Sequence, residues 1–329
     1  MTRRTIGTAV QSWPVAGSFT IARGSRTEAV VVSVSLEEDG FEGHGECTPY
    51  ARYGETPQTV LAQIEAVAGL IEEGCSRAGL LMAMKAGAAR NALDCALWDL
   101  EAKKSGVPAH VLAGIDRLSP VTTAFTISLG SPQRMAADAA AASERPILKI
   151  KLGGGDDDPA RIAAVREAAP DATLIVDANE GWTPDTLIRN LDACRDAGVD
   201  CVEQPLPANA DDALFGLDHE VPLCADESAH GIEELDRLAA LYDMINIKLD
   251  KTGGLTGALQ LVSAAKAHDL GIMVGCMLGS SLAMAPAFLL TPWARFVDLD
   301  APLLLAKDRE PGMRYEGSIV YPPSRSLWG

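Results

Sequence analysis

Five charged residues, each at the end of a short apolar run, recur along the middle of the chain at nearly constant intervals. They are Lys151, Asp177, Glu203, Asp226 and Lys248, and the intervals between them are 26, 26, 23 and 22 residues. A strand, a helix and two loops need about this length, so the series predicts successive βα units. Because barrel enzymes carry their chemistry at the carboxyl ends of the strands, the pattern gathers two amines and three carboxylates at one rim.

The same pattern continues from residue 121 to residue 298 and predicts eight strands, the number that a closed barrel requires. The predicted strands are Val121–Ser128, Ile147–Leu152, Leu174–Asp177, Val199–Glu203, Leu223–Asp226, Met244–Lys248, Ile272–Cys276 and Phe296–Asp298. The fold class is therefore α/β, with a TIM-type barrel. A chain of 329 residues has room for a barrel of about 200 to 250 residues and a smaller domain.

Residues 1–112 show a different pattern, which predicts an N-terminal α+β capping domain. Apolar side chains alternate over residues 29–37, and helical stretches follow at residues 58–73 and 87–104. We expect the barrel to span residues 113–310. The remaining residues, 311–329, are too few for a domain, and we expect this tail to pack on the capping domain.

Composition narrows the class of protein. The net charge of −17 argues against nucleic acid as a partner and is interpreted as a solubility feature. The seven cysteines are odd in number and contain no CxxC motif, which favours a reducing compartment over zinc or disulfides. No apolar run is long enough for a membrane span, and no apolar core of a signal peptide follows Met1–Arg4. The expected location is the cytoplasm, with no membrane partner.

Two lysines end the second predicted barrel strand. Alternation along a strand puts Lys149 and Lys151 on one face and Ile150 on the other. Inside a small barrel an unpaired ammonium group is costly unless carboxylates or a metal site lie nearby. The alternative is a pair of lysines that points into solvent at the end of a strand.

Three carboxylates end consecutive predicted strands, namely Asp177, Glu203 and Asp226. Oxygen ligands without histidine or thiolate suit a hard cation, Mg²⁺ first and Mn²⁺ next. A single aspartate in such a position is more often a helix cap or a loop residue. Three like charges at neighbouring strand ends need a counter-ion, which favours a metal site.

Two amines, Lys151 and Lys248, end strands four places apart in a ring of eight, so we expect them to face each other across the barrel. A substrate carboxylate on the metal would then have its α-carbon between the two amines. This arrangement can deliver a proton to either face of that carbon, as a racemase or an epimerase requires. A neighbouring ammonium group and a divalent cation would both depress a lysine pKa, so that one amine is neutral near physiological pH.

Three further residues could bind a substrate. Asp298 and Asp300 alternate onto one face at the end of the eighth strand and could bind an ammonium group, or they could be a solvated pair at the start of a loop. Arg26 lies in a glycine-containing loop, residues 22–27, that could close over the barrel mouth and pair with an acidic side chain.

The motifs resemble those of the enolase superfamily, in its muconate-lactonising subgroup, over nearly the whole chain. They are Lys149-x-Lys151, Asp177-Ala-Asn, Glu203-Gln-Pro, Ala225-Asp-Glu-Ser228, Asn246-Ile-Lys248-Leu-Asp-Lys-Thr-Gly-Gly254 and the helix at residues 88–99. The resemblance implies a modified (β/α)₇β barrel and one essential Mg²⁺ per subunit on Asp177, Glu203 and Asp226. It also implies acid/base roles for Lys151 and Lys248, with Lys149 helping to hold the substrate carboxylate.

Within this subgroup the segments at residues 22–26, 47–50 and 298–300 resemble dipeptide epimerases that act on L-Ala-D/L-Glu. In those enzymes the acid pair holds the dipeptide ammonium group, and the arginine that matches Arg26 meets the glutamate side chain. The resemblance implies an isomerase for murein dipeptides, working through a metal-stabilised enediolate. The alternatives are a cycloisomerase, an N-acylamino acid racemase, an o-succinylbenzoate synthase or a non-catalytic metabolite-binding barrel. Homo-oligomers are expected by analogy with other barrels.

Overall fold

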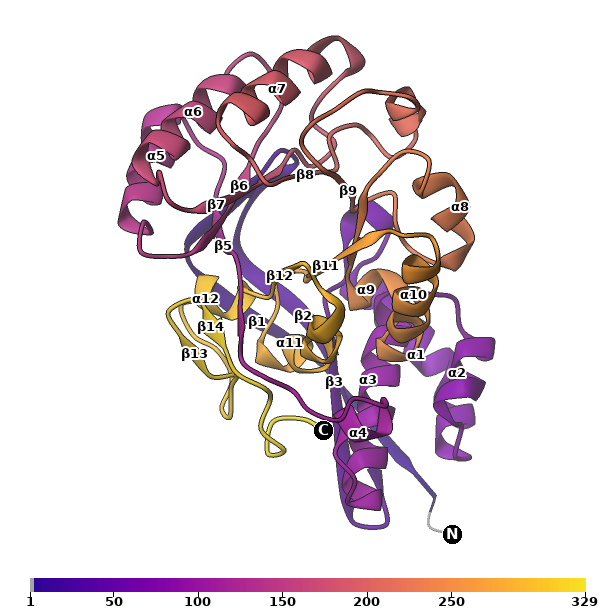
Figure 1. Cartoon of the computed structure of the whole chain (residues 1–329). Coiled ribbons are helices and arrows are strands. Elements are labelled where there is room, and N and C mark those ends of the chain that lie inside the picture. Colours follow the sequence, from indigo (N-terminus) through magenta and orange to yellow (C-terminus); the bar gives the residue numbers. More distant parts are fainter. Residues whose placement is uncertain (1–2) are drawn as a thin grey trace.

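The structure, a computed structural model, describes residues 3–329 as a capping domain beside a barrel (Figure 1). The capping domain contains a three-stranded antiparallel sheet in the order β1, β2, β3. Its strands are β1 (Thr5–Ile21), β2 (Gly24–Glu38) and β3 (Phe41–Cys47). Its helices are η1 (Ala51–Tyr53), α1 (Pro57–Glu72), α2 (Arg77–Ala83), α3 (Ala88–Ser105) and α4 (Ala109–Leu112).

The structure confirms strands followed by helices in this region and adds elements that the sequence pattern does not reveal. The long strand β1 lies at the edge of the sheet with most of its side chains exposed, so its sequence lacks clear alternation. Pro14 is compatible with an edge strand because it removes a backbone donor. The predicted loop at residues 22–27 is shorter than expected: Arg26 belongs to β2, where it pairs with Phe19 of β1.

Helix α3 packs unusually close to the sheet. Glycine makes this possible, because a Cβ at Gly43 would lie 2.4 Å from the carbonyl oxygen of Ala96. A Cβ at Gly45 would lie 2.0 Å from the carbonyl oxygen of Ala92. No side chain fits at either distance. The two glycines of β3 therefore fix the position of α3 against the sheet.

The barrel contains eight parallel strands, which confirms the predicted fold class (Figure 1). They are β5 (Phe125–Ile127), β6 (Ile147–Lys151), β7 (Thr173–Asp177), β8 (Cys201–Glu203), β9 (Leu223–Ala225), β10 (Met244–Ile247), β11 (Gly271–Gly275) and β12 (Phe296–Asp298). The backbone N–H of Ala124 donates to the carbonyl oxygen of Val297 at 2.8 Å and joins the first barrel strand to the last. The prediction of one strand at Val121–Ser128 is wrong, because β4 (Val121–Thr122) pairs with the C-terminal segment instead.

The helices around the barrel vary in length. They are α5 (Pro132–Ala141), α6 (Asp158–Ala168), α7 (Pro184–Asp196), η2 (Asp211–Leu214), η3 (Ile232–Glu234), α8 (Leu235–Leu238), α9 (Leu249–Thr252), α10 (Leu255–Ala267), α11 (Ser281–Ala287), η4 (Phe288–Trp293) and α12 (Ala301–Leu304). Long helices follow β6 and β7, whereas only η2 follows β8 and only the short η3 and α8 follow β9.

Apolar and charged side chains occupy different parts of the barrel interior. One end is filled by a compact apolar cluster that includes Ile175, Met244 and Phe296. Ile150 belongs to the larger core between strands and helices. Lys149 and Lys151, on the opposite face of β6, are buried among carboxylates. The alternation predicted for this strand is therefore correct.

The C-terminal segment contacts both parts of the molecule. Its strands β13 (Tyr315–Glu316) and β14 (Ile319–Val320) pair with each other, and β14 pairs with β4. At its end the indole N–H of Trp328 donates to the carbonyl oxygen of Cys95 at 3.0 Å. The N–H of Gly329 donates to Asp99 Oδ1 at 2.7 Å. The last residues thus pack on α3; the domain boundaries at residues 112 and 310 stay a prediction.

Replacing Trp328 by alanine should lower the free energy of unfolding by about 3–5 kcal/mol, because the side chain is almost fully buried and large. Trp328→Phe removes only the indole donor and should cost about 1 kcal/mol. Urea unfolding of the three proteins measures both values. Equal stability of all three would show that the tail does not pack on α3.

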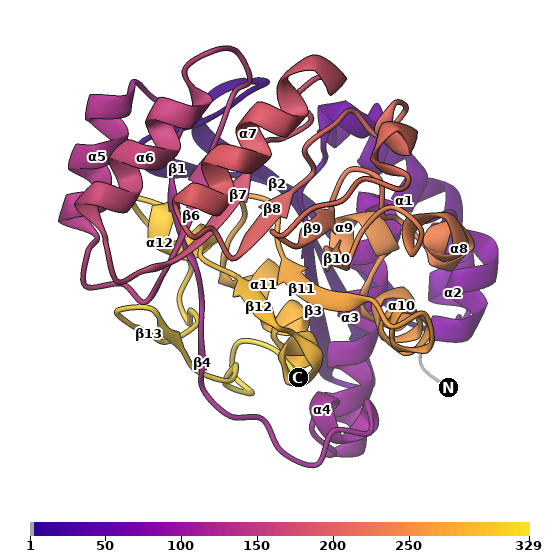
Figure 2. The same ribbon diagram turned by 45° about the horizontal axis from the view of Figure 1, so that its top comes forward.

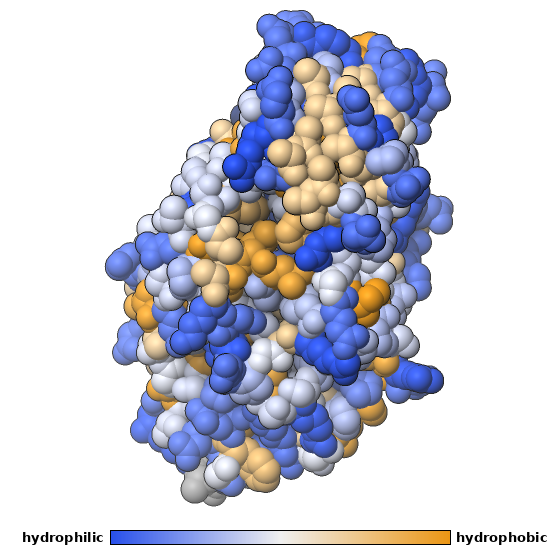
Figure 3. All heavy atoms as spheres, turned by 90° about the vertical axis from the view of Figure 1, so that its left-hand side faces the viewer, coloured by the Kyte–Doolittle hydropathy of each residue, from blue (hydrophilic) through white to orange (hydrophobic). Residues whose placement is uncertain are grey.

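Two features concern the exterior. The face in Figure 3 is mostly hydrophilic around a central apolar area, as the high net charge leads one to expect. Within residues 3–329, no helix has the length and apolarity needed to cross a bilayer.

Seen from the direction of Figure 2, the β1–β2 hairpin extends to the barrel, where Thr20 accepts a hydrogen bond from the N–H of Leu129.

Candidate active site

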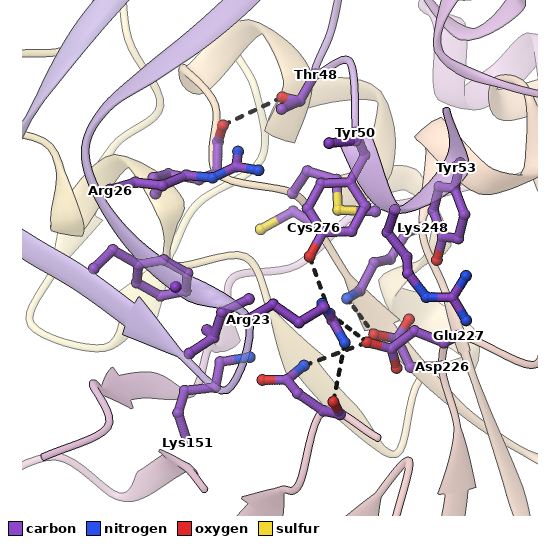
Figure 4. Close-up of a pocket in the computed structure, with 18 of the residues that line it drawn as sticks. Arg23, Arg26, Thr48, Tyr50, Tyr53, Lys151, Asp226, Glu227, Lys248 and Cys276 are labelled. Carbon is purple, nitrogen blue, oxygen red and sulfur yellow. Dashed lines mark hydrogen bonds and ion pairs between the residues drawn. The ribbon is translucent and has the colours of Figure 1, made fainter. Parts of the chain in front are cut away.

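A cavity of about 400 Å³ lies between the capping domain and the carboxyl ends of the barrel strands (Figure 4). The capping domain contributes side chains from the β1–β2 hairpin and from the segment at residues 48–53. The barrel contributes Lys151, Lys248 and residues that follow β7, β9 and β11. The residues that line it include Phe19, Arg23, Arg26, Thr48, Tyr50, Tyr53, Lys151, Asn179, Asp226, Glu227, Lys248 and Cys276.

Two amines approach the cavity from opposite parts of the barrel. Lys151 ends β6 and Lys248 directly follows β10, and these strands are four positions apart in the sheet. Figure 4 shows Lys151 on one side of the cavity and Lys248 on the other, beside Asp226. Lys151 Nζ lies 2.5 Å from Asp177 Oδ2, and Lys248 Nζ lies 2.6 Å from Asp226 Oδ2. The structure thus brings the two predicted bases to one space.

The three carboxylates predicted as metal ligands are buried at neighbouring strand ends. Burial would raise the pKa of Asp177, but the ammonium groups of Lys151 and Lys149 outweigh it and lower the pKa to about 2. Asp226 is held well below its ordinary pKa, because Lys248 and Lys251 outweigh the effect of burial. Burial and the charge of Asp177 raise the pKa of Glu203 to about 7. The site therefore contains buried charges of both signs, and each carboxylate pKa depends on the neighbouring charges.

The third predicted lysine, Lys149, lies deeper than the cavity wall. Its Nζ is 2.6 Å from Glu203 Oε2, 2.7 Å from Asp298 Oδ2 and 3.3 Å from Asp177 Oδ2. A cation in this position counters the mutual repulsion of the carboxylates.

The depressed lysine pKa values predicted beside a bound cation stay a prediction; the protein's own carboxylates act in the opposite direction. Burial alone would lower the pKa of Lys248, but Asp226 and Glu203 outweigh it and raise that pKa well above its ordinary value. The pKa of Lys149 is raised in the same way, by Asp298 and Glu203 against burial. The carboxylates Asp177 and Asp226 are in direct contact with Lys151 and Lys248.

The donor set fits a divalent cation. Three buried carboxylates at adjacent strand ends supply only hard oxygen ligands, as Mg²⁺ and Mn²⁺ require. In the described part of the chain, no three His, Cys, Asp or Glu side chains converge as a ready metal cluster. Lys149 Nζ contacts both Asp177 and Glu203. The metal-ligand role of Asp177, Glu203 and Asp226 stays a prediction.

The two aspartates expected at the end of the last strand are both buried but differ in setting. Asp298 ends β12 and pairs with Lys149, while its Oδ1 is buried without a hydrogen-bond partner among the described residues. Asp300 lies beyond the strand, at the start of α12, where it accepts a hydrogen bond from the N–H of Thr126 at 2.7 Å. Strand alternation does not extend to Asp300, because β12 ends at Asp298; the shared face of the two aspartates stays a prediction.

The two arginines of the hairpin have different environments. Arg26 lines the cavity with its guanidinium 5.4 Å from the centre of the Tyr50 ring, and within residues 3–329 it forms no ion pair with a carboxylate. Arg23 donates to Glu227 Oε1 at 2.6 Å and to the carbonyl oxygen of Asn179 at 3.0 Å (Figure 4). Of the two, Arg26 is the one with donors available for an anionic ligand.

Three residues at the site had no role assigned from the sequence. Arg23 joins the hairpin to the barrel loops through Glu227. Lys251 Nζ donates to Asp226 Oδ1 at 2.6 Å and to the carbonyl oxygen of Asn246 at 2.9 Å, and so fixes a predicted metal ligand. Glu227 and Lys251 lie inside motifs that the sequence analysis quoted. Each follows a charged strand-end residue by one to three positions, and this spacing could have identified them from the sequence.

Models of two protein domains match most of the chain. The mandelate racemase/muconate lactonizing enzyme N-terminal domain matches residues 3–114, and the enolase C-terminal domain-like model matches residues 133–324. The chain belongs to the enolase superfamily. This confirms the family inferred from the motifs, and the fold is the TIM-type barrel with a separate N-terminal domain that this superfamily shares.

Two curated relatives of this superfamily member carry activities in their names. L-Ala-D/L-Glu epimerase of Escherichia coli (strain K12) is 48% identical over 95% of this chain and 98% of the relative. N-acetyl-D-glutamate racemase of Pseudoalteromonas sp. is 43% identical over 91% of this chain and 95% of the relative. Epimerases and racemases are isomerases, which supports the class of enzyme inferred from the sequence.

Two solved structures of superfamily members contain ligands. An Agrobacterium tumefaciens protein with homology to dipeptide epimerases, crystallised with sodium and L-Ala-L-Glu, has a TM-score of 0.97 at 52% identity, covering 99% of this chain and 100% of that chain. Dipeptide epimerase from Cytophaga hutchinsonii, complexed with Mg and D-Ala-L-Val, has a TM-score of 0.92 at 29% identity, covering 98% of this chain and 94% of that chain. Both support a small-molecule ligand, and the second supports a divalent metal.

Proposed function

We propose that this protein is a metal-dependent dipeptide epimerase that inverts the α-carbon of the C-terminal residue, with L-Ala-D/L-Glu as the favoured substrate. The observation that carries the proposal is the pair of amines, Lys151 and Lys248, that enter one cavity from strands four positions apart. Binding alone needs no proton donor on each side of a ligand. The two positions suit removal of a proton from one face of a carbon and its return to the other.

The chain's own residues divide the work as follows. Asp177, Glu203 and Asp226 would hold one Mg²⁺, with Mn²⁺ as a substitute, and the metal would stabilise the enediolate charge. Carboxylates that share a divalent cation attract the lysines less strongly, so Lys151 and Lys248 become free to exchange protons with the substrate. Lys149 stays between the carboxylates and Asp298 and helps to hold the substrate carboxylate.

The two activities named among the relatives act on substrates that differ at the amino end. A dipeptide has a free ammonium group, whereas N-acetylglutamate has none. Asp298 Oδ1 is a buried carboxylate oxygen without a partner among the described residues, and an ammonium group would satisfy it. We therefore favour the dipeptide, with Asp298 and Asp300 at its amino end; the N-acylamino acid racemase remains the second candidate.

A direct comparison tests this choice. Inversion of L-Ala-L-Glu and of N-acetyl-L-glutamate is followed by chiral chromatography with the Mg²⁺-loaded protein. We expect kcat/KM to be at least about tenfold higher for the dipeptide, since one charge-assisted hydrogen bond to a buried group contributes about 1.5–3 kcal/mol. A higher value for N-acetyl-L-glutamate would assign the protein to the second candidate.

Arg26→Ala should lower kcat/KM for L-Ala-L-Glu by roughly 30-fold or more while sparing L-Ala-L-Leu. The reason is that Arg26 faces the cavity and has no acidic partner in the described part of the chain, so a substrate carboxylate can pair with it away from water. Steady-state kinetics with both dipeptides measure the effect, with Arg26→Lys as a control that keeps the charge. Equal losses for the two substrates would show that Arg26 does not read glutamate.

A further inference from the structure

The two catalytic lysines of the proposed function are held in place by different parts of the molecule. Lys248 stands at the N-terminal end of α9, and its carbonyl oxygen accepts hydrogen bonds from the N–H groups of Lys251 at 3.0 Å and Thr252 at 3.1 Å. Any shift of this short helix therefore moves the backbone of Lys248. The contacts that hold α9 differ from those of β10, the barrel strand that precedes it.

Helix α3 of the capping domain forms hydrogen bonds with α9 and with the turn after it. Arg90 donates to the carbonyl oxygens of Thr252 at 2.7 Å and Gly253 at 3.0 Å. Asn91 Nδ2 donates to Asp250 Oδ1 at 2.8 Å, and this carboxylate also accepts from the N–H of Thr48 in the cavity wall at 3.1 Å. The views in Figures 1 and 2 both place α3 beside α9 and α10.

The contact continues onto α10 and is tight. Asp94 accepts hydrogen bonds from the N–H of Thr256 at 2.8 Å and from its hydroxyl at 2.6 Å. The glycines between α9 and α10 have positive φ values, and a Cβ on Gly254 would lie 2.5 Å from Asp94. Arg90, Asn91 and Asp94 are all buried. A buried polar contact of this density fixes one position of the segment.

The backbone that follows Lys151 is held from within the barrel instead, although its ammonium group lies 5.9 Å from the centre of the Phe19 ring in the capping domain. Asp158 Oδ2 accepts from the N–H of Gly154 at 3.0 Å, in the loop after β6, and from the indole of Trp182 at 2.9 Å. The N–H of Leu152 donates to the carbonyl oxygen of Asp177 at 2.9 Å. These supports belong to the barrel itself, away from α3.

We propose that α3 is a positioning element for Lys248 alone, so that Arg90 and Asn91 control proton transfer on one face of the substrate α-carbon. Asp158 has the corresponding role for Lys151. The inference rests on the proposed two-lysine function and extends it: helix α3 sets the geometry of one base, while the rest of the capping domain closes the cavity. The helix motif at residues 88–99, which the reaction itself does not use, acquires a role in this way.

The test measures α-proton exchange in D₂O separately from L-Ala-L-Glu and from L-Ala-D-Glu, with Lys248→Ala defining which isomer Lys248 serves. Asn91→Ala should lower exchange from that isomer about tenfold or more relative to the other isomer, since small misplacements of a reacting group cost this much. Arg90→Lys keeps the charge, should act in the same direction, and serves if Asn91→Ala does not fold. Asp158→Asn should show the opposite preference.

A matched control separates positioning from general loosening of α3. Trp328→Phe removes a hydrogen bond to the same helix on its tail side and should leave the ratio of the two exchange rates unchanged. Equal losses from both isomers in Asn91→Ala and Arg90→Lys would overturn the inference. A Lys248→Ala protein that exchanges both isomers equally would overturn the two-lysine function on which the inference stands.

Discussion

Lys151→Ala and Lys248→Ala should each abolish epimerisation, because within residues 3–329 they are the only lysines that line the cavity and they enter it from strands four positions apart. General acid–base catalysis supplies about 10²–10⁴-fold in rate, and inversion needs both partners. Each single variant should still exchange the α-proton of one stereoisomer with solvent, since the surviving amine can remove a proton and return it on its own side. Chiral chromatography and α-deuterium incorporation measure the two outcomes.

Arginine variants serve as controls for charge. Lys151→Arg and Lys248→Arg keep a cation beside Asp177 or Asp226 but cannot act as a neutral base near physiological pH. They should be as inactive in epimerisation as the alanine variants and better folded. Equal exchange from both stereoisomers in either alanine variant would refute the two-base arrangement.

Glu203→Gln should lower kcat/KM by about 10²–10³-fold, the second-largest effect we expect. The substitution keeps the shape of the side chain and removes a buried charge that the metal would bind. Chelation should stop turnover by the unmodified protein, and Mg²⁺ or Mn²⁺ should restore it. Calorimetric titration with Mg²⁺ gives a second measure, and Glu203→Gln should bind the metal far more weakly.

Glu220→Gln is the matched control, since it makes the same change at an exposed carboxylate. It should leave both metal binding and turnover unchanged. Full activity of a chelated, metal-free sample would remove Asp177, Glu203 and Asp226 from the role of metal ligands.

The barrel was predictable because its strands are buried on both sides and end in charged residues. Apolar runs at intervals of 22–26 residues are enough to place Lys151, Asp177 and Lys248 at one rim. The edge strand β1 was not predictable from alternation, since most of its side chains are exposed. The predicted strand Val121–Ser128 is divided into β4 and β5 in the structure. The cause is the pairing of β4 with β14, a strand almost 200 residues away in sequence.

The site shows a similar limit. Residues at strand ends were found from spacing alone, whereas partners from distant segments were not. Arg23 meets Glu227 only because the hairpin reaches the barrel, and Asn91 meets Asp250 only because α3 packs on α9. That Asp300 lies beyond β12 was not predictable, because the end of this strand depends on its pairing with β11, which stops at Asp298. Contacts of this kind follow from tertiary packing and leave no periodic signal in the sequence.

The most direct test of the central claim is incubation of the Mg²⁺-loaded protein with L-Ala-L-Glu in D₂O, with mass and chiral analysis of the product. We expect a mixture of L-Ala-L-Glu and L-Ala-D-Glu with one deuterium at the α-carbon of the glutamate residue and none at the alanine α-carbon. Recovery of unlabelled L-Ala-L-Glu without inversion would contradict it.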